Sequence, residues 1–302
     1  MRKVIITGVN GFIGSHLCKQ FCEAGVEVEG WDLGYQCRFD IPYYRVDLCD
    51  YTQVLSSLEK TNADAFIHCA GCADVGKSVK DPHMDFEGNT KAVHNLLFAL
   101  KSLGKNQLKI LTISSAAVYG NPSQLPICES AELKPVSPYA LHKEMAERIC
   151  AYFIENYEFD IKILRIFSAY GPGLKKQIFW DMYQKLQSKG ELPMFGTGRE
   201  SRDYIYIDDI CQAIRLIMER SPRDEHIYNI ANGKEVTIRQ VATEFAKKVG
   251  KDESIVSFCG TVREGEPINW RADVSKLQKL GYHQTVSLED GIEKYLQWVR
   301  QQ

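Results

Sequence analysis

The stretch VIITGVNGFIGSHL, from Val4 to Leu17, joins a β-branched run to a helical pattern through three glycines. Gly8, Gly11 and Gly14 follow the run at intervals of three residues. Between a strand and a helix, such glycines permit a tight turn and a close approach of the backbone to a pyrophosphate, and the helix N-terminus points at that anion. The stretch therefore predicts a dinucleotide site in an α/β fold, with a ligand-free glycine turn as the alternative.

A carboxylate at Asp32 supports the dinucleotide interpretation. Asp32 ends the second β-branched run, 18 residues after Gly14. A carboxylate there accepts hydrogen bonds from both ribose hydroxyls and repels a 2′-phosphate, which selects NAD over NADP. No arginine follows Asp32 directly, and Arg38, further along, is equally explained as a solvated loop residue.

Two residues at the next strand end are candidates for holding adenine. The segment RVDLCD places Asp47 and Leu48 there, one a carboxylate and the other apolar. A helix cap before Tyr51 is the alternative for this segment.

The order of patterns along the chain predicts the fold class. Short β-branched runs alternate with helical patterns: KVIITG, VEVEGWD, DAFIHCAG, LKILTISS and IKILRIF are the runs. Strands that alternate with helices form a parallel sheet covered on both faces. We therefore expect a Rossmann-type, doubly wound parallel sheet.

After Phe167 the alternation of strand and helix patterns becomes less regular, which indicates a smaller second lobe. Turn residues in AYGPGLKK and PMFGTGRESRD surround one helix near Ile178 to Ser188. The later segments DYIYIDDICQAIRLIME and IYNIAN resemble another helix and strand of the first lobe, so the second is discontinuous. We expect a first lobe of residues 1–167 and 203–232, and a C-terminal substrate lobe of residues 168–202 and 233–302.

Composition limits the classes of partner. The chain has 302 residues, with 37 basic against 39 acidic side chains and no long run of one sign. This balance provides no electrostatic footprint for nucleic acid or an anionic membrane. No run of about 18 apolar residues follows the N-terminal MRKVII, so we expect a protein without a membrane segment.

The cysteines indicate a reducing compartment. Ten cysteines are scattered along the chain, without the dense framework of a small secreted domain, which favours the cytoplasm. Cys69 and Cys72 lie beside His68 with the spacing of a redox pair or half a metal site. No second Cys/His pair with ligand spacing exists, so we expect a structural role and no metal.

A second informative stretch is SPYALHKEMAERI, from Ser137 to Ile149. Ser137 and Pro138 are typical of a helix start. Tyr139 and Lys143 then lie four residues apart on one helical face, with Cβ atoms about 5 to 6 Å apart. A Tyr-x-x-x-Lys spacing alone is weak evidence, because an ordinary surface pair has the same spacing.

Taken together, several motifs resemble the extended short-chain dehydrogenase/reductase family, in particular its nucleotide-sugar epimerases and dehydratases. They are the glycine triplet, HCAG, SSAAVYG, PYALHK, LRIFSAYGPG, SRDYIYIDD, YNIANG and REGEP, and they extend over nearly the whole chain. The resemblance implies an NAD lobe, a lobe for a nucleoside-diphosphate sugar, and Ser115, Tyr139 and Lys143 as the catalytic set. It also implies a homodimer that pairs through the helices near Phe86 to Leu103 and Tyr139 to Asn156.

The chemistry of this set follows from the residue types. Lowering the pKa of Tyr139 from about 10 to about 7 requires roughly 4 kcal/mol of preferential stabilisation of the phenolate. A cation about 6 Å away supplies close to 3 kcal/mol at an effective dielectric constant of 20, so Lys143 and the nicotinamide together suffice. Tyr139 then accepts a proton from a sugar hydroxyl while the Ser115 hydroxyl steadies the oxygen.

The residues that follow Ser115 limit the reactions that the chain can catalyse. Relatives that dehydrate or decarboxylate carry an acidic residue just after the Ser115 position, where this chain has Ala116 and Ala117. We therefore predict an NAD-dependent 4-epimerase of UDP-hexose type that works through a transient 4-keto intermediate. The close alternative is a 4-keto-6-deoxysugar reductase. A catalytically idle NAD-binding or scaffold protein is disfavoured because Ser115, Tyr139 and Lys143 are all retained.

For the substrate, the resemblance assigns Arg202 and Arg263 to a diphosphate clamp and Glu266 to the nucleoside ribose. Surface ion pairs with the adjacent Asp203 and Glu264 are the alternative for the two arginines. Ser168 stands where many relatives carry an asparagine near the diphosphate. The predicted cofactor contacts are Gly8, Asn10, Gly11, Phe12, Ile13, Gly14, Asp32, Asp47, Leu48, Ala70, Asn89, Tyr139 and Lys143, and the predicted substrate contacts are Ser115, Ser168, Arg202, Arg263 and Glu266.

Overall fold

The computed structural model describes residues 1–261 and 268–302. The strands are β1 Lys3–Thr7, β2 Glu27–Asp32, β3 Tyr43–Arg45, β4 Ala65–His68, β5 Lys109–Ser115, β6 Asp160–Ile166, β7 Ser168–Tyr170, β8 Leu192–Met194, β9 Ser201–Arg202, β10 Tyr204–Tyr206, β11 Ile227–Ile230, β12 Val236–Thr237 and β13 Val256–Phe258. The helices are α1 Phe12–Glu23, α2 Tyr51–Glu59, α3 Val75–Lys80, α4 Pro82–Phe86, α5 Ala92–Ser102, α6 Pro138–Tyr157, α7 Gln177–Lys189, α8 Ile207–Arg220, α9 Ile238–Lys248, α10 Ser275–Lys279 and α11 Leu288–Val299. A π-helical turn η1 Glu87–Lys91 joins α4 to α5, and 3-10 turns form η2 Ala116–Tyr119 and η3 Glu253–Ile255.

Seven strands form one sheet in the order β11-β6-β5-β4-β1-β2-β3, and every neighbouring pair is parallel. This confirms the predicted doubly wound sheet. The strand order reverses between β1 and β4, where Thr7 pairs with His68. In such sheets a ligand binds in the crevice beyond the carboxyl ends of the strands at this reversal.

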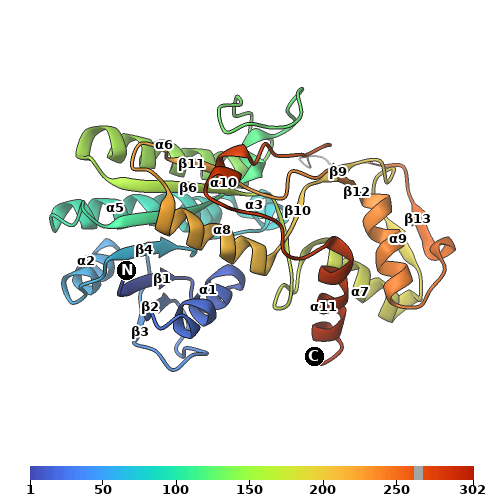
Figure 1. Cartoon of the computed structure of the whole chain (residues 1–302), viewed down its shortest axis with the longest axis horizontal. Helices are drawn as coiled ribbons and strands as arrows, with labels where there is room; N and C mark the ends of the chain where they lie inside the picture. The colour runs from blue at the N-terminus through green and yellow to red at the C-terminus, as the bar shows by residue number, and fades with distance from the viewer. Residues whose placement is uncertain (262–267) are drawn as a thin grey trace.

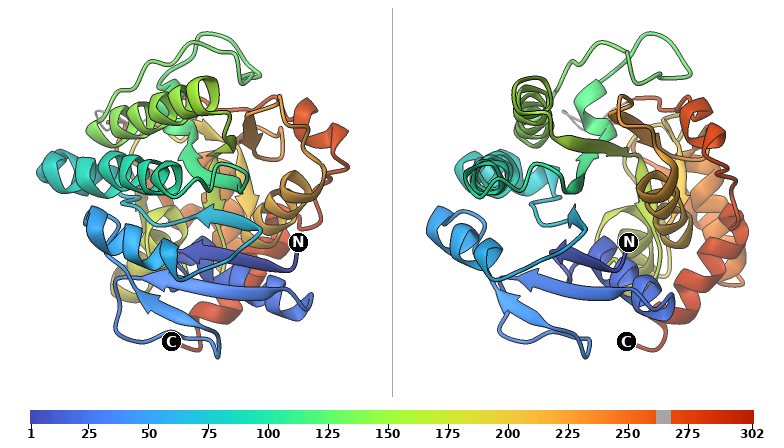
Figure 2. Two further views of the ribbon diagram at one scale, coloured as in Figure 1. Left: turned by 90° about the vertical axis from the view of Figure 1, so that its left-hand side faces the viewer. Right: turned by 60° about the vertical axis from the view of Figure 1, so that its left-hand side comes forward.

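Helices cover both faces of the sheet (Figure 2). Val4 and Ile6 of β1 belong to the core that includes α1 and α8, whereas Ile5 belongs to the core under α2, α5 and α6. All three side chains are fully buried. Because successive strand residues point to opposite faces, a strand buried on both faces reads as the continuous apolar run seen in the sequence.

The C-terminal region adds a second group of elements beside the sheet, with α7, α9, α11 and β13 to its right in Figure 1. Three short sheets tie this region together: β10 with β7, β12 with β9, and β13 with β8. β11 returns to the edge of the main sheet, and α8 packs against α1. The sequence pattern groups β10 with the first lobe, but β10 pairs with β7 outside the main sheet. The expected boundaries therefore assign two paired strands to different lobes.

Within the described ranges, no helix combines the length and the apolar character needed to cross a membrane. The same residues contain no group of three or more His, Cys, Asp or Glu side chains arranged to hold a metal ion. All ten cysteines are free thiols.

Candidate active site

The glycine turn between β1 and α1 is shaped by two close backbone contacts. Gly8 has φ +64°, and its N–H donates to the carbonyl of Trp31 at 2.8 Å. A Cβ on Gly8 would lie 2.8 Å from the amide nitrogen of Ala70, and one on Gly14 would lie 2.2 Å from the Gly8 carbonyl oxygen. Only glycine fits either position without a backbone shift.

The N-terminus of α1 is open toward this turn. Its cap, Gly11, provides no side-chain hydrogen bond to the first amides of the helix. Unsatisfied amides at a helix N-terminus bind anions, and the glycines leave space for a phosphate to approach. The residues present therefore fit a dinucleotide pyrophosphate.

The expected ribose carboxylate is held firmly at the end of β2. One oxygen of Asp32 accepts from the Asn10 amide at 2.9 Å, and the other accepts from the Leu33 amide at 2.7 Å. The Asn10 side chain in turn accepts from the backbone N–H of Arg38 at 3.1 Å. Each carboxylate oxygen keeps a second lone pair for a ribose hydroxyl, which fits NAD.

The adenine candidates have different surroundings. Asp47 accepts from the Cys49 amide at 2.9 Å, whereas the cap of α2 is Asp50, which accepts from two amides of the first turn. The helix cap before Tyr51, which is the alternative for this segment, is therefore present, and Asp50 supplies it instead of Asp47. Leu48 is largely buried in the core, and its carbonyl accepts from the Asn95 side chain at 2.9 Å.

The three predicted catalytic residues converge beyond the carboxyl edge of the sheet. Ser115 ends β5, and Tyr139 and Lys143 lie in the first two turns of α6. Ser137 caps α6 by accepting from the Ala140 amide at 3.2 Å, with Pro138 at the first helical position, as the sequence predicts. The helix start thus sets the direction of Tyr139.

Burial acts in opposite directions on the two ionisable members of this set. It raises the pKa of Tyr139 to about 12, against the effect of a hydrogen bond with the Ser115 side chain. It lowers the pKa of Lys143 to about 8, opposed mainly by the charge of Asp85. The Lys143 ammonium donates to the Ile113 carbonyl at 2.9 Å. Lowering the tyrosine pKa through the joint charge of Lys143 and the nicotinamide stays a prediction for the cofactor-bound enzyme.

Asn89, a predicted cofactor contact, lies in η1 and is 1 % exposed. Its amide Nδ2 donates to Asp85 at 3.0 Å, while its Oδ1 is buried without a hydrogen-bond partner among residues 1–261 and 268–302. A Cβ placed on Gly71 would lie 2.8 Å from this oxygen and 3.5 Å from Nζ of Lys143. The Asn89 carbonyl oxygen and the lysine ammonium therefore face one small region beside the strand ends. Ala70, also predicted, lines the glycine turn and donates its amide to Thr7.

Candidate substrate residues lie in the second group of elements. Nη1 of Arg202 donates to the carbonyl of Ser201 at 2.9 Å, and its guanidinium lies 5.7 Å from the centre of the Trp270 ring. The backbone N–H of Ser168 donates to the carbonyl of Asp203 at 3.0 Å. The carboxylate of Asp203 accepts from the amides of Asn232 and Ala272. Arg263 and Glu266 lie outside the described residues.

The cysteine pair beside His68 has the features of a structural element. Nδ1 of His68 is 2.9 Å from the Thr7 hydroxyl oxygen, and burial lowers the pKa of its ring to about 3. Burial also raises the pKa of Cys69 to about 12 and that of Cys72 above its usual value. Metal binding and disulfide exchange need thiolates, which these environments disfavour.

Sequence reasoning missed three buried residues near the catalytic set. The hydroxyl of Ser78 accepts from the backbone N–H of Tyr139 at 3.1 Å. Nδ1 of His142 lies 2.6 Å from a carboxylate oxygen of Asp85, and both side chains are buried. In the sequence, His142 precedes Lys143 and Asp85 lies four residues before Asn89, and no other signal marks them. Their contacts link separate helices, so sequence spacing does not reveal them.

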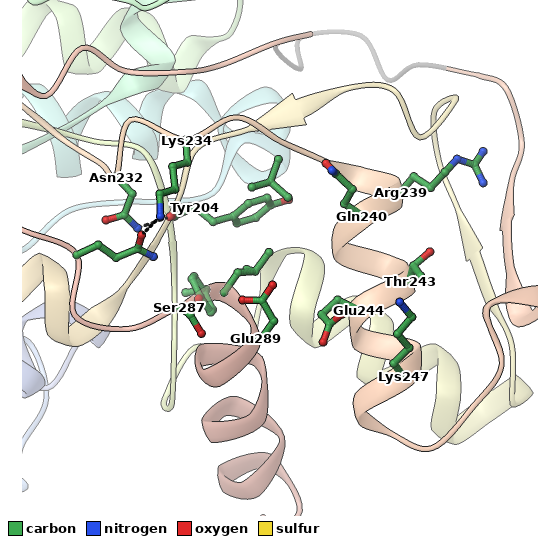
Figure 3. Close-up of a pocket in the computed structure, with 14 residues that line it drawn as sticks. Tyr204, Asn232, Lys234, Arg239, Gln240, Thr243, Glu244, Lys247, Ser287 and Glu289 are labelled. Atoms are coloured by element: carbon green, nitrogen blue, oxygen red, sulfur yellow. Dashed lines mark hydrogen bonds between the residues drawn. The ribbon is translucent and has the colours of Figure 1, made fainter.

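A separate groove of about 570 Å³ lies between α9 and the beginning of α11 (Figure 3). Its lining includes Lys234, whose ammonium donates to the Gln284 side chain at 2.7 Å, and Arg239, Glu244 and Lys247 of α9. None of the predicted catalytic or cofactor residues lines it. We therefore assign the reaction to the strand ends and not to this groove.

Comparison with known proteins agrees with this geometry. The model of the family described as "NAD dependent epimerase/dehydratase family" matches residues 4–231. A putative UDP-glucose 4-epimerase from Methanocaldococcus jannaschii is 27% identical over 98% of each chain.

Two solved structures are similar over almost their whole length. A UDP-glucuronic acid 4-epimerase from Bacillus cereus, in complex with UDP-glucuronic acid and NAD, is 29% identical with a TM-score of 0.87 over 99% of each chain. A dTDP-glucose 4,6-dehydratase from Streptomyces venezuelae with NAD bound is 27% identical, with a TM-score of 0.89 over 99% of this chain and 97% of that one. The parallel sheet, the glycine turn and the family match of the present chain together show that this chain belongs to the NAD-dependent epimerase/dehydratase family, with NAD as its cofactor.

Proposed function

We propose that the protein is an NAD-dependent nucleotide-sugar 4-epimerase of UDP-hexose type that works through a transient 4-keto intermediate. The observation that carries the proposal is the convergence of Tyr139, Ser115 and Lys143 at the strand ends, with two alanines directly after Ser115. Ala116 is fully buried at the beginning of η2, and the amide of Ala117 donates to the Ser115 hydroxyl.

The side chains have separate roles in this reaction. NAD, when bound, supplies the acceptor and donor of a hydride. Tyr139 removes the proton from the sugar 4-hydroxyl and later returns it, and the hydroxyl of Ser115 holds the same oxygen through a hydrogen bond. The ammonium of Lys143 favours the phenolate of Tyr139 through its charge. Asp32 selects NAD by accepting from the ribose hydroxyls.

Epimerisation also requires the sugar to present its other face. The nucleotide must stay anchored while the sugar turns, and we assign this anchoring to Arg202, Arg263 and Glu266, with Ser168 close to the diphosphate. A guanidinium suits a diphosphate because its planar fork donates two parallel hydrogen bonds. The small side chain of Ala117, which is only partly buried, leaves space for the sugar to turn.

Fold similarity does not separate epimerase from dehydratase, because relatives of both kinds match this chain over nearly its whole length. The absence of a carboxylic acid after Ser115 separates them, since elimination of water across C5 and C6 needs a further acid/base group. The 4-keto-6-deoxysugar reductase alternative needs the same three residues and net consumption of reduced cofactor. NAD selection by Asp32 favours the epimerase, which regenerates its cofactor in each cycle.

The proposal extends to organisation and location. We assign NAD to residues 1–167 and 203–232, and the nucleotide sugar to residues 168–202 and 233–302. We also propose a homodimer through α5 and α6, which expose Phe98, Leu141 and Tyr152 by 40%, 45% and 52%. The ten free thiols support a cytoplasmic location, where thiols stay reduced.

A substrate panel tests the proposed function. Purified protein supplied only with NAD is incubated with UDP-, dTDP-, GDP- and CDP-sugars, and the products are separated by chromatography. We expect UDP-glucose or its N-acetyl counterpart to become a mixture with its 4-epimer, without accumulation of NADH. Stoichiometric consumption of NADH by a 4-keto-6-deoxysugar, with no epimerisation of any sugar, would replace the epimerase with the reductase.

A further inference from the structure

We infer that Asp85 and His142 form a buried positioning pair behind the reaction centre, which orients the Asn89 amide and supplies the countercharge of Lys143. The inference deepens the proposed function and rests on it, because it concerns the residues that tune the proposed acid/base group. Asp85 belongs to no motif that the sequence singles out, and His142 lies within PYALHK, where the sequence assigns it no role.

The pair connects two consecutive elements, α4 and η1, to α6. Asp85 lies in α4 and is 1 % exposed, and its Oδ2 lies 2.6 Å from Nδ1 of His142 in α6. Its Oδ1 accepts from Nδ2 of Asn89 in η1 at 3.0 Å. The Phe86 ring packs against the edge of the His142 ring with 5.5 Å between centroids. Both carboxylate oxygens are therefore held by partners on other elements.

The carboxylate determines the direction of the Asn89 amide. An ionised Asp85 only accepts hydrogen bonds, so Asn89 must present its NH₂ group to it and turn Oδ1 the opposite way. That oxygen faces the region shared with the Lys143 ammonium, beside Gly71. A buried carbonyl oxygen without a partner is destabilising, so its retention indicates a donor that arrives with a ligand or with Lys143.

Among the residues that the structure describes, Asp85 is an anion near Lys143 that is not paired with an arginine or a lysine. The other titratable groups that act on Lys143 are Cys69, Cys72 and Glu147, and Lys143 in turn acts on His68. Glu147 is paired with Arg165 at 2.6 Å and also accepts from Ser114.

The remaining neighbours of Lys143 are uncharged near neutral pH. Burial raises the pKa of both thiols and lowers that of His68, and Tyr139 is protonated in the absence of further positive charge. Asp85 is thus the group whose charge holds a proton on Lys143, and His142 orients it.

A purely structural pair is a weaker explanation. A buried ion pair contributes little net stability, and well-packed apolar residues of similar volume do as well or better. The two oxygens of Asp85 instead contact the His142 ring and the Asn89 amide, whose carbonyl oxygen faces Lys143.

The experiment measures the ionisation of Lys143 directly. Protein labelled with ¹³C at lysine Cε is titrated by NMR, and Lys143→Met identifies the Lys143 signal. We expect Asp85→Asn to lower the pKa of Lys143 by about 1 to 2 units, the effect of removing one nearby buried charge. The matched control, Glu144→Gln, removes a carboxylate that pairs with Arg148 on the same helix and should leave the Lys143 pKa within about 0.3 units.

Activity supplies a second readout. Because the Lys143 ammonium must be present, kcat of Asp85→Asn at pH 8 should fall about tenfold, with its pH optimum displaced toward acid and KM for the sugar changed less than about twofold. A structural defect would instead lower the active fraction without moving the pH profile. An unchanged Lys143 pKa in Asp85→Asn overturns the inference whatever the activity.

Two further outcomes are decisive. A lowered Lys143 pKa in a protein that epimerises no sugar keeps the pair and overturns the proposed function. If Asp85→Asn does not fold, His142→Gln decides, because it removes the ring that holds Oδ2 of Asp85 and should move the Lys143 pKa by more than the Glu144→Gln control does. A Lys143 pKa in His142→Gln equal to that of the control would reject the pair.

Discussion

Tyr139 and Lys143 show how burial acts at the scale of single residues. Burial raises the pKa of Tyr139 to about 12 and lowers that of Lys143 to about 8, so it opposes the charged form of each. The reactive protonation states therefore depend on neighbouring charges and on the bound cofactor, which makes each side chain open to a specific test.

Tyr139→Phe should retain the fold and NAD binding and lose most turnover. Removing a general acid/base typically lowers the rate by about 10² to 10⁴, while the phenylalanine ring keeps the packing of the tyrosine. Steady-state kinetics gives kcat, and the absorbance spectrum and thermal unfolding report bound cofactor and fold. A variant with kcat close to the wild-type value would remove Tyr139 from the catalytic set.

Lys143→Met should make the cofactor-free protein more stable at pH 6.5. Lys143 has a pKa of about 8 in the folded protein against 10.5 in the unfolded chain, so the unfolded state binds the proton more tightly. Below pH 8 this lowers the free energy of unfolding by about 3 kcal/mol, and the cost disappears as the pH rises from about 8 to 10.5. Loss of the hydrogen bond to Ile113 offsets about 1 kcal/mol.

Urea unfolding at several pH values checks this sign. We expect a net gain of about 1 to 2 kcal/mol at pH 6.5 that vanishes near pH 10.5. The exposed Lys189→Met should change stability by less than about 0.5 kcal/mol at every pH. A destabilised Lys143→Met protein at pH 6.5 would show that the buried ammonium does not carry this cost.

At the scale of elements, the β1–α1 unit is specified by local chemistry. The glycines, the absence of a side-chain cap on α1 and the position of Asp32 all follow from sequence spacing, and the structure shows the expected strand, turn and helix. The long stretch from Phe86 to Leu103 is more complex, because a π-helical turn and then α5 replace the single helix that the pattern predicts.

Gly14→Ala should damage the cofactor site much more than other helical glycine substitutions. The new Cβ would lie 2.2 Å from the Gly8 carbonyl oxygen, so the turn must shift. We expect NAD affinity, measured by calorimetry, to fall at least about tenfold, because the turn sets the approach to the pyrophosphate. Gly76→Ala in α3 is the matched control, since its Cβ would meet only Asp74 Oδ1 at 3.4 Å, and it should bind NAD normally.

At the scale of the whole molecule, α5 and α6 lie side by side on one face of the sheet (Figure 2). They expose Phe98 and Tyr152, and Phe98 stacks on His94 at 5.8 Å between centroids. Exposed aromatic side chains on adjacent helices are typical of an interface, because burying them removes apolar area from water.

Phe98→Glu combined with Tyr152→Glu should therefore convert a dimer into a monomer. Two charges in the buried centre of an interface are costly to desolvate, and the monomer fold should persist because both side chains are exposed in it. Light scattering after size exclusion gives the mass. Tyr35→Glu, at a position 83% exposed and outside both helices, should remain dimeric. A wild-type protein with the mass of one chain would reject the proposed pairing.

The sequence by itself determined the fold class and the cofactor, and it predicts which side chains react. Strand runs, the glycine turn and the Tyr139–Lys143 spacing depend on contacts within a few residues, so the order of residues in the sequence is enough to predict them. Only the tertiary structure placed Asp85 beside His142 and Asn89 beside Lys143, because these contacts join α4, η1 and α6. It also decided that burial dominates both pKa values, since desolvation depends on everything packed around a group and no local pattern records it.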